Sequence, residues 1–231
     1  MKKHFYLPLV VVLLFCIQGY SQEESSFGAF ISNPVGQFKS TDLENGGFAK
    51  TGWGIVFDSK NELKFLSEGW FLYFHSTYQW NEMDTELVAE KFTEELGNRT
   101  EVSASRYSPI LMTVGPAREF ALSEKFTLGI NTGLGIVFGN TKAFTVKVFD
   151  ANDNELANEL VNFDNRVAFA YTLGAEIKMM LVENLLGIAL FADYTSANQK
   201  VELSFTTANP VDSFQKMQTI NAGLRIVLKK Q

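Results

Sequence analysis

Charged side chains that interrupt runs of apolar and small residues are the clearest candidates for chemistry in this sequence. Four of them stand in such stretches: Glu119, Glu176, Lys178 and Arg225. Charges in a low-dielectric interior are costly unless they are paired. If one interior receives all four side chains, we expect an ion-pair cluster that fills it. The cluster then acts as a static plug or, alternatively, as the gate of a narrow pore.

Histidine offers little material for catalysis, because the chain contains only His4 and His75. A hydrolase needs a nucleophile with a base and an orienting partner nearby, and His75 is the one candidate base outside the N-terminal segment. We expect instead a single hydrogen-bonded histidine that faces the interior. The same count excludes metal sites built from histidine and cysteine. The sequence therefore predicts no enzyme activity, no metal and no cofactor.

The elements that must position these residues are strands, because the hydrophobic pattern has a period of two. The alternation is clearest over 126–138, 169–177 and 220–228. Weaker versions bring the number of expected strands to eight, and lie near 26–35, 47–58, 65–80, 107–120 and 185–197. Strands of about 9–11 residues suffice to cross a bilayer at a tilt. The expected fold is an all-β, eight-stranded antiparallel up-and-down transmembrane β-barrel.

The expected connections alternate between long and short. The long segments occupy about 36–46, 81–106, 140–166 and 198–215, and the short turns lie near 59–64, 121–125 and 181–184. This asymmetry is typical of outer-membrane barrels, whose long loops are extracellular and whose short turns are periplasmic. Within the long segments we expect a short amphipathic helix carrying Leu87, Val88, Phe92 and Leu96, and a hairpin of 145–149 with 155–161 that turns at 152–154. The acidic run 150–155 lacks the glycine and distal glutamate of a calcium loop.

The two faces of the expected strands differ in chemistry. One carries large apolar residues, whereas the other carries ten of the chain's 17 glycines. Glycine inside a strand usually marks a close approach, so we expect this face to line a narrow lumen where opposite strands meet. Aromatic residues near the strand ends predict two interfacial girdles. Toward the long loops these are Tyr78, Trp80, Tyr107, Phe138 and Tyr194; toward the short turns they are Phe65, Trp70, Phe120 and Phe126.

The N-terminus has the layout of a secretory signal: Lys2 and Lys3, an apolar run from Phe5 to Ile17, then small and polar residues. We expect residues 1–21 to be a cleaved signal peptide and 22–231 to form one outer-membrane barrel domain. The only cysteine, Cys16, is removed with the signal. Cleavage also changes the formal net charge from −6 to −8, because it removes two lysines and no acidic residue. An acidic chain does not favour nucleic-acid partners.

On these residues the chain resembles the outer membrane protein β-barrel domain family, the group of small eight-stranded barrels that includes OmpA-like and OmpX-like proteins. The segments that carry the likeness are Phe27–Phe30, Asn33–Phe38, Gly46–Gly52 and Ala222–Leu228. The resemblance implies an outer-membrane location, contact with outer-membrane lipids, and the barrel-assembly machinery as a partner during insertion.

Three functions remain open at this point. The first is a non-enzymatic barrel with a structural or adhesion role, whose acidic loops 81–106 and 140–166 meet an extracellular partner. The second is a small pore or a gating component of a secretion assembly. The third is a soluble periplasmic carrier of the lipocalin type, which would have its apolar residues inside. The sequence names no ligand, oligomeric state or physiological role, and it does not decide whether the lumen conducts.

Overall fold

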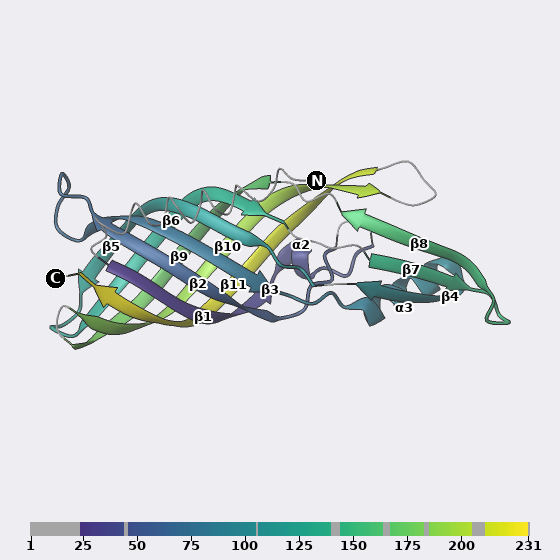
Figure 1. Ribbon diagram of the computed structural model, residues 1–231, viewed down its shortest axis with the longest axis horizontal. Coiled ribbons are helices and arrows are strands. Elements are labelled where there is room, and N and C mark those ends of the chain that lie inside the picture. Colours follow the sequence, from purple (N-terminus) through teal and green to yellow (C-terminus); the bar gives the residue numbers. More distant parts are fainter. Residues whose placement is uncertain are drawn as a thin grey trace, which may run out of the picture.

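A computed structural model describes residues 24–43, 46–104, 106–139, 144–163, 167–182, 185–204 and 211–230. The expected signal peptide, residues 1–21, lies outside these ranges. Eight long strands dominate the described chain: β1 (Glu24–Pro34), β2 (Gly52–Glu62), β3 (Trp70–Trp80), β5 (Ile110–Ala121), β6 (Phe126–Phe138), β9 (Val167–Val182), β10 (Leu186–Ser204) and β11 (Val211–Lys229). Each pairs antiparallel with the next, and β11 pairs with both β10 and β1. The sheet is therefore a closed barrel, which confirms the expected fold class (Figure 1).

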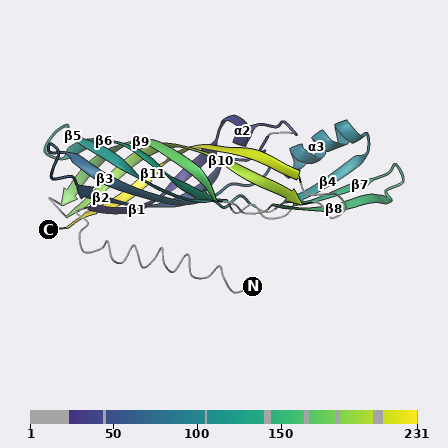
Figure 2. The same cartoon turned by 90° about the horizontal axis from the view of Figure 1, so that it is seen from above.

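Three shorter strands and a helix extend the molecule beyond one end of the barrel (Figures 1 and 2). They are β4 (Arg99–Ala104), β7 (Phe144–Phe149), β8 (Glu155–Phe163) and α3 (Thr85–Leu96). Strand β7 lies between β4 and β8, and the end of β8 pairs with β10 at Leu203 and Ser204. We call these four elements the extension. Their chain segments are two of the predicted long connections.

The helix and the hairpin of the extension follow local sequence signals. Asp84 caps the start of α3 by accepting a hydrogen bond from the Leu87 amide, and Gly97 ends it with a left-handed φ of 68°. In the β7–β8 turn, the Asp150 carboxylate accepts hydrogen bonds of 2.8 Å from the amides of both Asn152 and Asn154. The predicted helix and hairpin are thus confirmed. Among the residues described, neither helix combines the length and the apolar character needed to cross a membrane.

Short connections join the strands at the opposite end of the barrel: 63–69 between β2 and β3, 122–125 between β5 and β6, and 183–185 between β9 and β10. The beginning of β1 and the end of β11 lie at this same end, because Glu24 pairs with Lys229. We call it the turn end, and the opposite end the loop end.

Several predicted boundaries were wrong. Residues 59–62, expected in a turn, continue β2, and residues 65–69, expected in a strand, form the turn before β3. The predicted long loop 198–215 is instead largely strand, because β10 reaches Ser204 and β11 begins at Val211. The polar residues in this segment gave no sign that β10 and β11 continue to pair beyond the other strands of the barrel. Residues 47–51 precede β2, and of these Ala49 makes an isolated bridge to Met83.

The orientation of the strands matches the prediction. Ile130, Leu173 and Leu224 are 47%, 61% and 62% exposed on the outer wall, whereas Glu176 and Arg225 are 5% and 1% exposed. This pattern is the reverse of a soluble lipocalin-type barrel, which buries its apolar side chains and exposes its charged ones. The structure therefore excludes the carrier interpretation.

The glycines serve two purposes, of which only one was predicted. Gly129, Gly133 and Gly174 face lumen side chains, and a Cβ at Gly174 would lie 1.9 Å from an Asp193 oxygen. At Gly115, Gly135 and Gly223, by contrast, a Cβ would meet a backbone oxygen of the adjacent strand at about 2 Å. The expectation that side chains from opposite strands explain all these glycines was therefore wrong, since some permit close backbone approach within the wall itself.

Candidate functional site

The lumen of the barrel is the site where polar chemistry concentrates. Inward-facing side chains of the eight strands fill it from the turn end to the loop end. Two charged layers lie toward the turn end and an apolar layer lies at the loop end, with buried uncharged polar side chains such as Thr113, Asn131 and Thr172 between them. Each layer is held by strands that are distant in sequence.

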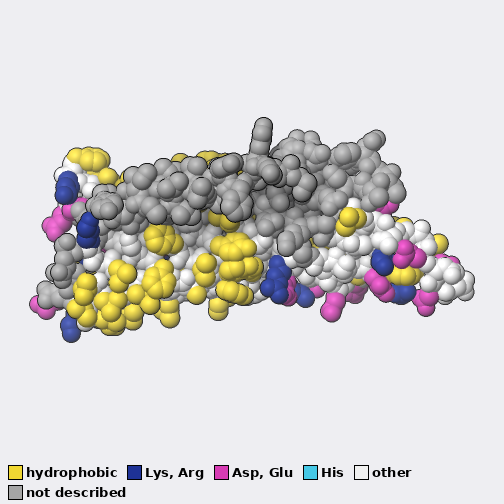
Figure 3. Space-filling model, in the orientation of Figure 1, with side chains coloured by type: hydrophobic (Ala, Val, Ile, Leu, Met, Phe, Trp, Pro, Cys, Tyr) yellow, Lys and Arg dark blue, Asp and Glu magenta, His cyan; other side chains and the backbone are white. Residues whose placement is uncertain are grey.

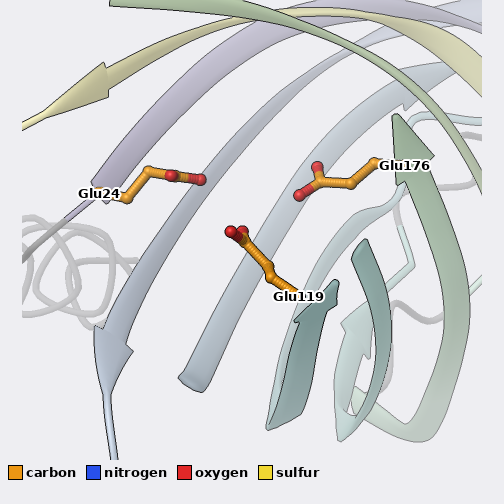
Figure 4. Close-up of side chains that lie close together, drawn as sticks. All are labelled: Glu24, Glu119 and Glu176. Atoms are coloured by element: carbon orange, nitrogen blue, oxygen red, sulfur yellow. The ribbon is translucent and has the colours of Figure 1, made fainter. Parts of the chain in front are cut away.

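The layer nearest the turn end is a set of five charged side chains, which we call the basal cluster: Glu24, Lys60, Glu119, Glu176 and Lys178. Figure 4 shows its three carboxylates pointing toward one another from β1, β5 and β9. Their oxygens lie within 4.8 Å of one another, a spacing that would suit a metal ion.

Two ammonium groups occupy this position instead. The Lys60 Nζ lies 3.3 Å from Glu24 and 2.6 Å from Glu119, and it also contacts Glu176. The Lys178 Nζ lies 2.5 Å from Glu24 and 2.8 Å from Glu119. Each lysine thus bridges at least two acids in a buried, charge-assisted network. A resident metal ion would compete with both lysines, so the donor set fits structural ion pairing and does not fit a metal centre.

Gly129 makes the space for this cluster. It lies on β6 between its cross-strand partners Glu119 and Glu176. A Cβ at this glycine would lie 2.8 Å from the Glu176 Cγ. The absence of a side chain at this position of β6 therefore leaves space for the Glu119 and Glu176 side chains of the neighbouring strands β5 and β9.

The next layer, which we call the central cluster, is formed by Asp58, Tyr73, His75, Asp193 and Arg225. The Arg225 guanidinium forms its shortest ion pair with Asp58, and its NH1 lies 3.0 Å from the Tyr73 hydroxyl oxygen and 3.5 Å from Glu176. Its Cζ lies 3.8 Å from the Phe191 ring centroid. The contact with Glu176 joins the central and basal clusters into one network.

His75 has an acidic partner at one ring nitrogen and an acidic neighbour beyond the other. Its Nδ1 lies 2.7 Å from Asp58 and 3.1 Å from the Tyr73 hydroxyl, and its Nε2 faces Asp193 at 4.0 Å. A catalytic histidine would present this second nitrogen to a serine, threonine or cysteine nucleophile. Among the described residues the Nε2 has no hydrogen-bond partner of that kind, so the arrangement does not form a nucleophilic triad.

An apolar layer closes the loop end. The short helix α2 (Gly36–Lys39) places Phe38 inside the barrel mouth, where it is 1% exposed. Phe38 packs edge-on against Tyr107 at a centroid distance of 5.1 Å. We call the whole layer the apolar plug. Besides Phe38 and Tyr107, it consists of Ala49, Leu111, Val137, Ala168, Ala170, Ala197 and Met217.

Tyr107 therefore does not belong to an interfacial girdle, as its aromatic character suggested. It is buried in the apolar plug, and its hydroxyl donates a hydrogen bond of 2.7 Å to the Gly47 carbonyl oxygen. Outward aromatic residues at the loop end include Trp53 and Tyr78, each in ring contact with Trp80, the contacting pair Tyr171 and Tyr194, and the exposed Phe169. Trp53 was not among the residues assigned to the predicted girdle.

The structure brings all four predicted cluster residues, Glu119, Glu176, Lys178 and Arg225, into one connected network and places His75 inside it. Five members were missed: Glu24, Asp58, Lys60, Tyr73 and Asp193. For Asp58, Tyr73 and Asp193 the signal was present, because each continues the inward parity of its strand beside an outward-facing residue, namely Phe57, Leu72 and Ala192. Lys60 had no such signal, because it lies in the predicted turn 59–64. Glu24 lies before the predicted first strand and had no such signal.

Comparison with known proteins yields structural similarity alone. No protein-family model matches the sequence, and no curated protein matches it either. The chain is similar to a major outer membrane protein of Thermus thermophilus (10% identity, TM-score 0.46, covering 88% of this chain and 99% of that one). It is also similar to OprG of Pseudomonas aeruginosa (10%, 0.43, 91% and 98%) and to Ail of Yersinia pestis (15%, 0.37, 88% and 99%).

Proposed function

We propose that this chain is a non-enzymatic outer-membrane β-barrel that holds an acidic interaction platform outside the cell. The observation that carries the membrane location is the distribution of side chains around the barrel wall. Large apolar residues are exposed on the outside of the barrel, whereas the charged residues of the basal and central clusters are buried in the lumen. Exposing this much apolar surface to water would be unfavourable by about 25 cal/mol per Å², so a lipid environment best explains it.

The surface of the two halves supports the same proposal. In Figure 3, hydrophobic side chains gather over the barrel, whereas acidic and basic side chains gather over the extension and at the opposite tip. An apolar band flanked by two polar ends is the pattern expected of a bilayer-spanning barrel. The turn end then faces the periplasm and the extension faces the exterior.

Layered side chains in the lumen favour a structural role over a pore. The basal cluster fills the turn end, and the apolar plug fills the loop end. An eight-stranded barrel leaves room only for side chains. We therefore expect the resting protein not to conduct ions. Planar-bilayer recording tests this expectation: the absence of discrete openings supports the structural role, and steady channel openings would favour the pore.

The extension provides the platform. Glu86, Glu90 and Glu94 recur every four residues along α3 and are exposed, so they form one acidic stripe. Residues at this spacing share a helix face. We propose that this stripe meets a basic surface on the extracellular partner, because opposite charges steer association and select the partner.

Two measurements test the proposal. Heat-modifiability on unboiled gels after membrane fractionation should show a compact barrel in the outer-membrane fraction, and recovery in the soluble periplasm would contradict the location. Cells that display the protein should bind amine-coated beads several-fold better than cells that display E86Q/E90Q. The matched control is E68Q/E124Q, which removes two acids at the turn end. Equal binding by both variants would contradict the role of the stripe.

A further inference from the structure

Arg118 is a cation without an acidic partner on the apolar outer wall. Its side chain points outward, as do those of Pro116 and Phe120 on the same strand. Its cross-strand neighbours are Trp70 on β3 and Ile130 on β6. Of the diagonal neighbours, Leu72 and Leu128 are apolar and Thr132 is an uncharged polar residue. Among the described residues Arg118 forms no ion pair. Its positive charge is therefore isolated on a largely apolar surface.

Two aromatic rings hold the guanidinium in place. The Arg118 Cζ lies 5.1 Å from the centroid of Trp70 and 5.0 Å from that of Phe120. Cation–π contacts do not use the N–H groups as hydrogen-bond donors, and among the described residues the N–H edges of this guanidinium donate no hydrogen bond. Those edges form a rigid fork that matches the two oxygens of a phosphate group. The Trp70 and Phe120 rings therefore position the Arg118 guanidinium without accepting hydrogen bonds from its N–H groups.

The height of Arg118 on the wall fits a headgroup. It stands three residues before the end of β5, and Trp70 is the first residue of β3. Three residues of strand at a tilt near 45° correspond to about 7 Å below the rim. An arginine at the midplane of a bilayer is strongly unfavourable, but close to the interface most of this cost is removed because the side chain reaches the headgroups.

We propose that Arg118, Trp70 and Phe120 form a binding site for the phosphodiester of a glycerophospholipid in the leaflet around the turn end. The inference rests on the proposed membrane location, which puts this end of the barrel in the periplasmic leaflet. The phosphate supplies the negative charge that pairs with Arg118. The aromatic rings contact the adjoining part of the acyl chains. Water alone would solvate the guanidinium but would not explain its framing by two rings.

Native mass spectrometry of the full chain released from nanodiscs tests the proposal. The nanodiscs contain equal amounts of phosphatidylglycerol and digalactosyl diacylglycerol, a bilayer lipid without phosphate. Wild type should retain one phosphatidylglycerol and no preferred galactolipid. R118Q should lower retention about tenfold. R118K, which keeps the charge and loses the planar fork, should retain an intermediate amount, and K64Q, at a neighbouring turn, should behave as wild type.

Three outcomes would overturn the site: equal retention by wild type and R118Q, an equal loss in K64Q, or displacement of phosphatidylglycerol by lipid A when the latter is added to the nanodiscs. The experiment also separates this proposal from the previous one. If the chain fails to insert into nanodiscs as a heat-modifiable barrel, the membrane location fails. If it inserts and R118Q retains lipid as wild type does, only the phosphate site fails.

Discussion

Arg225 on the last strand of the barrel forms a buried ion pair with Asp58 on the second, although 167 positions separate them in the sequence. Strand β1 lies between their strands. The pair therefore spans the seam at which β11 meets β1 and the barrel closes. Because Arg225 also approaches Glu176 and Asp193, it connects the closing strand to both sides of the lumen.

Replacement of Arg225 by glutamine should strongly destabilise the barrel. The change leaves Asp58 without its cation and Glu176 with one cation fewer, and removing one partner of a buried pair costs about 3–5 kcal/mol. Urea unfolding of the refolded protein in micelles, followed by the gel shift, measures this loss. As a control, R99Q breaks an exposed pair with Asp153 and should cost less than about 1 kcal/mol. The double variant D58N/R225Q should recover part of the stability lost in R225Q, and no recovery would contradict the pairing.

Removal of both basal lysines should create a requirement for a divalent cation. In K60M/K178M the carboxylates of Glu24, Glu119 and Glu176 remain within one ligand sphere. They have lost their two shared ammonium groups, and among the described residues only the longer contacts from Lys229 to Glu24 (3.9 Å) and from Arg225 to Glu176 (3.5 Å) remain. Oxygen ligands of this kind suit Ca²⁺. Refolding with Ca²⁺ at about a hundred times its Kd should stabilise the variant by about 2.7 kcal/mol, seen as a higher urea midpoint. Wild type should not respond, and an equally insensitive variant would contradict the role assigned to the lysines.

Most of the fold was readable from the sequence because one physical rule governs every strand. A residue faces either lipid or lumen, so the strands with the cleanest alternation, such as β6 at 126–138, were located to the residue. The predicted strand ends were wrong where polar residues belong to a strand. Ser59, Lys60 and Asn61 resemble a turn in composition, but Lys60 is polar because it faces the basal cluster. Composition alone does not distinguish a strand whose polar residues face the lumen from a turn.

The site was less accessible for a different reason. Parity shows that Asp58, His75 and Arg225 face inward, but it does not show which of them meet. Their contacts depend on the register between strands and on how far each strand is displaced along its neighbour. The apolar plug was missed because its two aromatic rings, Phe38 and Tyr107, lie outside the regular strands, where alternation carries no information.

Phe38 should control the opening of the loop end. The variant F38A removes the ring at the centre of the apolar plug, and such a truncation costs about 3–5 kcal/mol. The loss should appear as local opening, since Phe38, Ala49 and Tyr107 lie outside the barrel ladder. The Ala49 amide donates a hydrogen bond to the Phe38 carbonyl oxygen, and its hydrogen exchange should accelerate by about a hundredfold. F65A, at an 81% exposed ring on the turn end, is the matched control. Unchanged exchange at Ala49 in F38A would contradict the plug.

Acid should loosen the β7–β8 turn. Hydrogen bonds from the Asn154 side chain and amide, together with one from the Asn152 amide, hold the pKa of the Asp150 carboxyl below its usual range. A carboxylate with a depressed pKa stabilises the fold above its unfolded pKa, and this contribution is lost as the pH falls through the folded value. Amide shifts of Asn152 and Asn154 should therefore titrate together below about pH 4. In D150N these two amides should show no such transition, and an unchanged titration there would assign the effect to another group.

The three tryptophans of the chain offer a test of the membrane orientation that needs no substitution. Trp53, Trp70 and Trp80 all face outward at or near strand ends, Trp70 toward the turn end and the other two toward the loop end. Amphipathic rings at these heights should lie at the two headgroup levels. In vesicles of brominated phosphatidylcholine, their fluorescence should be quenched more by bromines close to the headgroup than by bromines near the chain ends. W53F/W80F, which leaves Trp70 alone, should show the same preference. Quenching by aqueous iodide in place of the brominated lipids would mean that the apolar wall faces water, and the membrane-spanning arrangement would then be wrong.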